Sequence, residues 1–172
     1  MRSVHCLLVL FCLSLTGCFG EPTDTTLDQE PQAQAGAPAV ELAGWVTDAA
    51  DLLNDTQEKK LAAKLAALEV DTQHQMVIVT VPSLEGRDIK PFTTDLGNAW
   101  GIGRKGIHDG VIILVAPNER QARIAVGFGL EDTLSDNFCA SVLQIEMLPL
   151  FRQGDYYTGL DRGVTALADA VR

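Results

Sequence analysis

The sequence predicts an α/β fold, a three-layer α/β/α sandwich around a small mixed sheet of two parallel strands plus an antiparallel hairpin strand. Residues 76–81 and 111–116 are short apolar runs rich in β-branched side chains, which is typical of strands covered on both faces. A helical pattern lies between them. The two strands should therefore be parallel, with a right-handed crossover.

Each remaining element has its own signal. Leucines recur on one face of residues 54–71, which predicts a helix that Asn54 and Gln57 cap. Pro91 is suited to the start of the crossover helix, and Gly101 ends it.

The second half of the chain predicts a hairpin followed by helices. Residues 117–120 are predicted to be a turn, and residues 123–126 return as the antiparallel strand. Apolar residues at helical spacing then predict one helix after Ser135 and another over residues 160–171.

The N-terminus has the layout of a bacterial lipoprotein precursor. Arg2 precedes an apolar run too short to span a membrane, and Leu15-Thr16-Gly17-Cys18 resembles a lipobox. We therefore expect a signal peptide at 1–17, a lipidated flexible tether at 18–41 and one α/β domain at 42–172. An ordinary secretory signal that happens to contain a cysteine is the alternative.

Lipidation at Cys18 would place the protein in the cell envelope, anchored to the membrane. Phe19, in place of the aspartate that signals inner-membrane retention, favours the outer membrane, facing the periplasm. Cys6 and Cys12 would leave with the signal, so Cys139 would have no disulfide partner, and we expect a buried thiol.

The chain is acidic, with a formal net charge of −10. Binding to a phosphate backbone requires clustered Lys and Arg, so we expect no nucleic-acid partner. Residues 101–106 match Gly-x-Gly-x-x-Gly, but they follow a helix and precede a strand, the reverse of a dinucleotide site. We interpret them as a glycine-rich turn.

The hairpin is predicted to bring acidic residues together at one edge of the sheet. Such a cluster would need a compensating cation and suggests Ca²⁺ or Mg²⁺ as a cofactor, although acidic loops are also commonly just solvated. Two basic residues lie within reach and could bind an anion. The predicted metal ligands are Asp109, Glu131, Asp132 and Asp136, and the basic residues are Arg104 and Lys105.

Other candidate sites have weaker support. Arg120 and Arg123 could also bind an anion, but one lies in a turn and the other on a short strand, and we interpret both as solvated surface. No serine stands in a nucleophile-elbow motif. A serine hydrolase is therefore unsupported.

Several ordered motifs resemble the TPM domain family over about residues 45–172. The motifs are Val46-Thr47-Asp48-Ala49-Ala50-Asp51-Leu52-Leu53, Trp100-Gly101-Ile102-Gly103-Arg104-Lys105-Gly106, Asp109-Gly110-Val111-Ile112-Ile113-Leu114-Val115, Arg123-Ile124-Ala125-Val126-Gly127-Phe128-Gly129-Leu130-Glu131 and Met147-Leu148-Pro149-Leu150-Phe151-Arg152-Gln153-Gly154-Asp155-Tyr156.

The resemblance implies an α/β/α domain found in photosystem II repair proteins of the thylakoid lumen and in bacterial envelope proteins, some of which resemble divalent-cation-binding acid phosphatases. It adds Asp48 to the predicted metal ligands. Gly127 and Gly129 match the family's glycine pair, whereas His108 stands where an acidic residue is common.

Two functions follow as expectations. The first is an envelope lipoprotein whose domain binds a divalent cation and assists membrane-protein maintenance or assembly through an envelope protein partner. The second is a metal-dependent phosphomonoesterase, in which the cation polarises a phosphoryl oxygen. The sequence offers no identifiable nucleophile, and whether the protein is an enzyme stays open.

Overall fold

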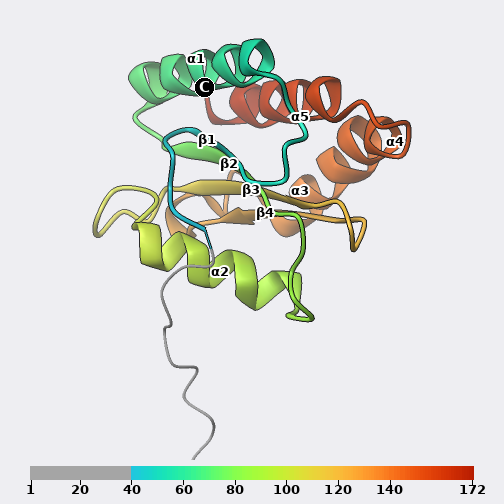
Figure 1. Cartoon of the computed structure of the whole chain (residues 1–172). Coiled ribbons are helices and arrows are strands. Elements are labelled where there is room, and N and C mark those ends of the chain that lie inside the picture. The colour runs from blue at the N-terminus through green and yellow to red at the C-terminus, as the bar shows by residue number, and fades with distance from the viewer. Residues whose placement is uncertain (1–39) are drawn as a thin grey trace, which may run out of the picture. The chain divides into compact units, whose positions relative to one another are not determined.

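A computed structural model describes residues 40–172, and the predicted signal peptide and almost all of the predicted tether lie outside them. The elements follow in chain order (Figure 1). They are β1 (Val46–Asp48), α1 (Asp55–Thr72), β2 (Met76–Thr80), α2 (Ile89–Trp100), β3 (Val111–Ala116), β4 (Gln121–Val126), η1 (Phe128–Leu130), α3 (Asp136–Val142), η2 (Leu143–Met147), α4 (Leu148–Phe151) and α5 (Tyr156–Val171).

The sheet is mixed and has the order β1-β2-β3-β4. β1, β2 and β3 are parallel, and β4 pairs antiparallel with β3 from Val111↔Val126 to Ala116↔Gln121. The predicted parallel pair and hairpin are confirmed. β1, which has three residues, was not predicted.

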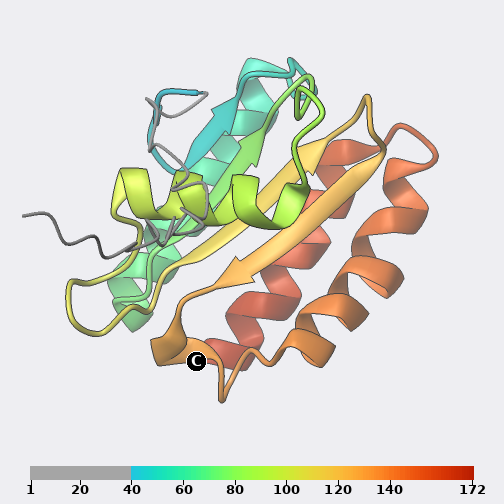
Figure 2. The same ribbon diagram turned by 90° about the horizontal axis from the view of Figure 1, so that it is seen from below.

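Helices cover both faces of the sheet, as the sandwich prediction requires. Met76 and Ile78 of β2 pack into a core with α1, α3, η2 and α5, whereas Val77 and Val79 point the other way, into a core with α2. Seen from below, α2 crosses one face of the sheet, and α3, α4 and α5 lie behind it (Figure 2). Alternate side chains of β2 thus pack into two separate cores.

The helix caps follow the sequence closely. Asn54 and Gln57 form the predicted capping box at the start of α1, and Ser135 accepts a hydrogen bond from the backbone N–H of Phe138 at the start of α3. α2 begins two residues earlier than predicted, with Asp88 as its cap. Pro91 still lies in the first turn, where its missing N–H costs nothing.

The helix predicted after Ser135 changes its winding before it ends. α3 continues into the π-helical turn η2 and then into α4, whose second residue is Pro149. Proline cannot donate to the carbonyl four residues back, so the altered turn precedes it. This turn sets the direction of α4 and therefore of the side chains that α4 presents.

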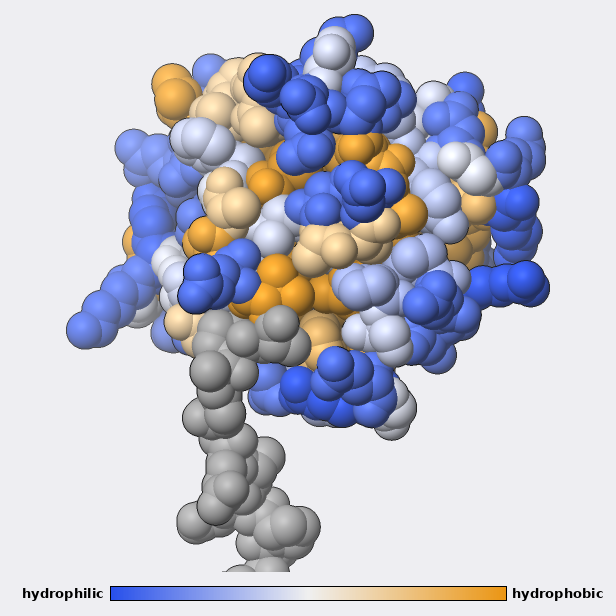
Figure 3. Space-filling model, viewed as in Figure 1, coloured by the Kyte–Doolittle hydropathy of each residue, from blue (hydrophilic) through white to orange (hydrophobic). Residues whose placement is uncertain are grey.

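The surface and the free thiol agree with the composition. In the view of Figure 3 most of the visible surface is hydrophilic, and apolar residues show in small areas near the middle.

Cys139 is buried, as predicted, and burial raises the pKa of its thiol to about 11. None of the helices in the described part of the chain is long and apolar enough to cross a membrane.

Candidate functional site

The hairpin brings its two glycine-containing ends together, as predicted. The backbone N–H of Gly127 donates to the carbonyl of Gly110 at 2.9 Å, and that of Gly129 donates to the carbonyl of His108 at 3.0 Å. Asp109 therefore lies between the two hydrogen-bonded residues His108 and Gly110, at the amino end of β3. This is the edge where the sequence predicted a cation site.

Asp109 is fully buried there, and its carboxylate is already occupied. Oδ1 accepts from the backbone N–H of Arg104 at 2.8 Å. Oδ2 accepts from Nε of Arg104 at 2.7 Å and from Nδ1 of His74 at 2.9 Å, and the Arg104 guanidinium also forms an ion pair with it at 2.6 Å. Burial would raise the pKa of Asp109, but these donors outweigh burial and hold the pKa far below its usual range.

The other predicted metal ligands do not join Asp109. Glu131, Asp132 and Asp136 are exposed on the segment between η1 and the first turn of α3. Among residues 40–172, no group of three or more His, Cys, Asp or Glu side chains is placed to share a metal ion. The expected convergence is therefore wrong, because Asp109 turns inward while the others face solvent. Cation binding by the protein stays a prediction.

Asp48 is the last residue of β1 and lies at the opposite end of the strands from Asp109. It therefore does not belong to the predicted acidic cluster. It pairs in register with Thr80, and Thr80 pairs with Val115. Val115 is six residues from Asp109, so Asp48 and Asp109 are separated by about 20 Å along the strand direction. Asp48 accepts hydrogen bonds from the Thr80 hydroxyl and, at 2.8 Å, from the backbone N–H of Leu53. These bonds fix the loop that leads into α1.

Arg104, one of the two predicted anion ligands, already has partners within the protein. Arg104 pairs with Asp109 and donates through Nη1 to the Gln73 side chain at 2.8 Å, so its guanidinium locks the glycine-rich turn in place. Each of its three guanidinium nitrogens has a partner within the protein, and anion binding by Arg104 stays a prediction. Lys105 is exposed beside it and forms no ion pair with another of residues 40–172.

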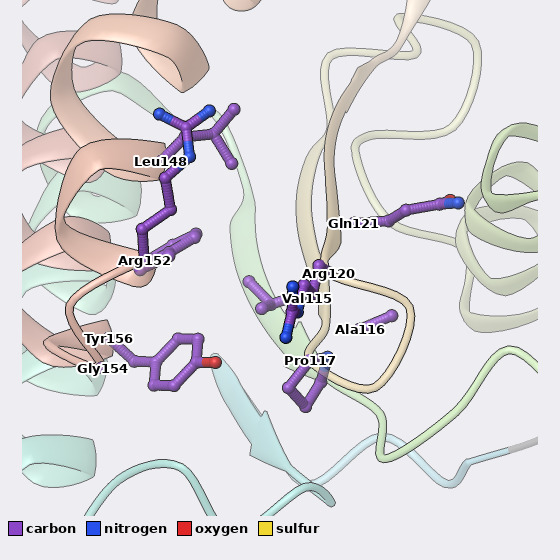
Figure 4. A pocket seen from close by; sticks show the side chains of 10 residues that line it. Val115, Ala116, Pro117, Arg120, Gln121, Leu148, Arg152, Gly154 and Tyr156 are labelled. Carbon is purple, nitrogen blue, oxygen red and sulfur yellow. The ribbon is translucent and has the colours of Figure 1, made fainter.

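A cleft of about 660 Å³ opens at the other end of the hairpin. We call it the arginine cleft. One wall comes from the end of β3, the turn and the start of β4, and the other comes from α4 and the start of α5 (Figure 4). It is lined by Val115, Ala116, Pro117, Arg120, Gln121, Leu148, Phe151, Arg152, Gly154 and Tyr156.

Arg120 is placed by the turn that joins β3 to β4. Its backbone N–H donates to the carbonyl of Pro117 at 3.1 Å, and its φ of 53° lies in the left-handed region, which is unusual for a side chain with a Cβ. The preceding Glu119 accepts from the Ser83 hydroxyl at 2.7 Å and from the backbone N–H of Leu84 at 2.9 Å. Through Oε1, Glu119 thus holds the turn against the segment that follows β2.

Arg152 is placed by the connection between α4 and α5. Gly154, with a φ of 82°, turns the chain, and the backbone N–H of Asp155 donates to the carbonyl of Leu150 at 3.0 Å. The rings of Phe151 and Tyr156 pack across this turn with their centroids 5.3 Å apart. Both walls of the arginine cleft are therefore fixed by hydrogen bonds or ring packing.

The charge of the arginine cleft differs from that of the chain as a whole. The chain carries a net charge of −10, but no Asp or Glu lines the cleft. Neither Arg120 nor Arg152 forms an ion pair with another of residues 40–172. Guanidinium groups bind phosphates and carboxylates through paired N–H donors, so this geometry suits an anion.

Sequence reasoning missed most of this site. It weighed Arg120 as an anion ligand and preferred solvated surface, and it gave Arg152 and Tyr156 no role. The signal available was their place in the motif over residues 147–156. Nothing in that motif shows that it faces the β3–β4 turn.

Comparison with known proteins agrees with the fold. The model of the TPM domain family matches residues 46–170. The solution structure of the N-terminal domain of a P. gingivalis protein shares 32% identity over 73% of this chain and 80% of its own, with a TM-score of 0.69. No curated protein matched the chain.

Two more distant structures show the same fold. The BA42 protein from the psychrophilic bacterium Bizionia argentinensis is 21% identical, over 69% of this chain and 81% of its own, with a TM-score of 0.61. The N-terminal domain of the cg2496 protein from Corynebacterium glutamicum is 17% identical, over 85% and 86%, with a TM-score of 0.60.

Proposed function

Since this chain belongs to the TPM domain family, whose model bears the name phosphatase, we propose that its domain binds a phosphate ester in the arginine cleft. One observation carries the proposal: Arg120 and Arg152 both line a cleft in which no carboxylate neutralises them. In an acidic chain, such a local reversal of charge favours an anionic ligand. The two arginines come from different walls of the cleft (Figure 4).

The position in the sheet supports the same proposal. In open sheets with parallel strands, ligands bind outside the carboxyl ends of the strands. The arginine cleft includes Val115 and Ala116, the last residues of β3, whereas the cluster expected from sequence lies at the amino end. Small-molecule sites commonly occupy clefts of about 300 to 1,000 Å³, and the volume of about 660 Å³ falls within that range.

Loss of either arginine should weaken phosphate binding. A hydrogen bond to a charged group contributes roughly 1.5 to 3 kcal/mol, so Arg120→Gln and Arg152→Gln are each expected to lower affinity about tenfold or more. Calorimetric titration of the purified full-length chain with inorganic phosphate and with glycerol 2-phosphate measures this. Arg162→Gln removes an exposed arginine that does not line the cleft and serves as the matched control. Equal affinities in all four proteins would reject the proposal.

Hydrolysis of the bound ester is the second candidate function, and the family name favours it. The cleft itself offers one hydroxyl, that of Tyr156, and no carboxylate that could hold a cation, so water would have to be the nucleophile. Turnover of phenyl phosphate, assayed with Ca²⁺, with Mg²⁺ and with chelator, distinguishes hydrolysis of the ester from binding alone. Cation-dependent turnover that Arg152→Gln abolishes supports a phosphomonoesterase. Binding without turnover leaves a recognition module, which suits an accessory role beside an envelope protein partner.

The lipid anchor is a separate proposal, and it rests on the sequence alone, because Cys18 lies outside the described residues. We expect Cys18→Ser to abolish palmitate labelling and to release the protein from the membrane fraction. Labelled palmitate incorporation and cell fractionation measure the two effects. Cys139→Ser changes a buried thiol within the domain and should alter neither. A wild-type protein that takes up no palmitate and is absent from the membrane fraction would argue for the ordinary secretory signal.

A further inference from the structure

We infer that the ester bound in the arginine cleft carries an apolar group, and that the wall formed by Leu148, Phe151 and Tyr156 selects for it. This inference rests on the proposed function and names the substrate class of the same site. The guanidiniums would hold the phosphate while the apolar wall covers the alcohol part of the ester. The juxtaposition of basic and apolar lining residues is the observation behind it.

The apolar wall is continuous and fixed in position. Phe151 and Tyr156 pack against each other with their rings tilted by 34°. Behind them, α5 has glycine at Gly159, where a Cβ would approach the ring of Phe151 to 2.5 Å. The ring of Phe151 thus fills the space that a larger residue would take, and it cannot withdraw toward α5. Leu148 lies one turn before Arg152 on the same wall.

The arrangement of polar groups gives a direction to the ligand. In Figure 4 the Tyr156 hydroxyl points away from α5 toward the hairpin wall, while Leu148 and Arg152 stand together on the opposite side from Arg120. Val115 of β3 also lines the cleft, although most of its side chain is buried in the main core. A phosphate alone would occupy only a small part of a cleft of about 660 Å³. The rest of the cleft includes the side chains of Leu148, Phe151 and Tyr156, which fit an aromatic or branched aliphatic group better than a hydroxylated one.

Comparing esters that share one phosphate tests this selectivity. For the wild-type full-length chain we expect phenyl phosphate to bind at least tenfold more tightly than glycerol 2-phosphate or inorganic phosphate. The reason is that burying apolar ligand surface is favourable in rough proportion to its area. Titration calorimetry with each compound measures the preference directly. The preference is read on the unmodified protein, so it does not depend on a variant that folds.

A variant then assigns the preference to the apolar wall. Leu148→Gln should reduce the ratio of phenyl phosphate affinity to inorganic phosphate affinity several-fold. Ile145→Gln, an exposed apolar residue at 68% that does not line the cleft, should change neither. Inorganic phosphate binding with no preference for phenyl phosphate would overturn this inference while the proposed function stands. If none of the three compounds bound, the proposed function itself would fail.

Discussion

Gly127→Ala is expected to destabilise the domain by about 3 kcal/mol, the upper part of the range for overpacked sites. A Cβ at this position would lie 2.1 Å from the carbonyl oxygen of His108 and 2.8 Å from its carbonyl carbon. Both are backbone atoms of a segment held by its own hydrogen bonds. Neither can rotate away, so the two ends of the hairpin would have to separate.

The cost is steric rather than conformational. Gly127 has a φ of −76°, which any residue adopts easily. Gly86→Ala provides the opposite case, because nothing lies within 4 Å of its Cβ position but its φ is 78°. Gly86→Ala should lower the free energy of unfolding by about 1 to 2 kcal/mol, because alanine is strained in the left-handed backbone conformation.

Thermal and urea unfolding of both variants measures this difference. For a domain of this size, about 3 kcal/mol corresponds to a fall of roughly 10 °C in Tm. A Gly127→Ala variant no less stable than Gly86→Ala would mean that the backbones at the amino end of β3 do not pack as closely as the structure has them.

The sequence predicted the architecture well because the signals for it are local. The runs that became β2 and β3 are apolar and β-branched throughout, and burial on both faces leaves such a run no other partner. β1 escaped notice because Val46–Asp48 is too short to show any alternation. Its place in the sheet is set by pairing with β2, a contact about 30 residues away in the chain.

The candidate site was predicted less well, because side-chain direction and long-range packing decide it. Hairpin pairing does bring Asp109 near the segment that leads to Glu131, but pairing does not say where a carboxylate points. His108, with a φ of 55°, turns the chain just before Asp109, and Asp109 then meets Arg104 and the distant His74. A cluster of like charges was expected where the structure has an ion pair.

The arginine cleft depends on an even less local feature. Its walls belong to the β3–β4 turn and to α4, which no sequence pattern links. α4 reaches the turn because η2 changes the helix winding and Gly163 of α5 leaves room for Met147, whose sulfur would lie 2.5 Å from a Cβ there. Arg152 faces the cleft as a result of that packing.

Asp109→Asn is expected to lower the free energy of unfolding by about 3 kcal/mol at pH 7. Removing one partner of a buried ion pair typically costs about 3 to 5 kcal/mol of stability. The variant would leave Arg104 without its counter-charge and would place amide N–H groups against other donors. We expect the lower end of this range because the Arg104 side chain is 40% exposed, so solvent partly screens its charge. Asp95→Asn breaks a 2.6 Å pair with Arg87 in which both side chains are about half exposed, and should cost less than about 1 kcal/mol.

The pH dependence of this cost follows from the lowered pKa of Asp109 in the folded protein. An unfolded aspartate titrates near about 3.9, so the stabilisation by Asp109 is complete above that pH and is lost as the pH falls toward the folded pKa. Asparagine has no such titration. The stability difference between wild type and Asp109→Asn should therefore shrink by about 1 kcal/mol between pH 7 and pH 3, measured by urea unfolding. A difference that stays constant over this interval would mean that Asp109 is not held as a buried carboxylate by Arg104 and His74.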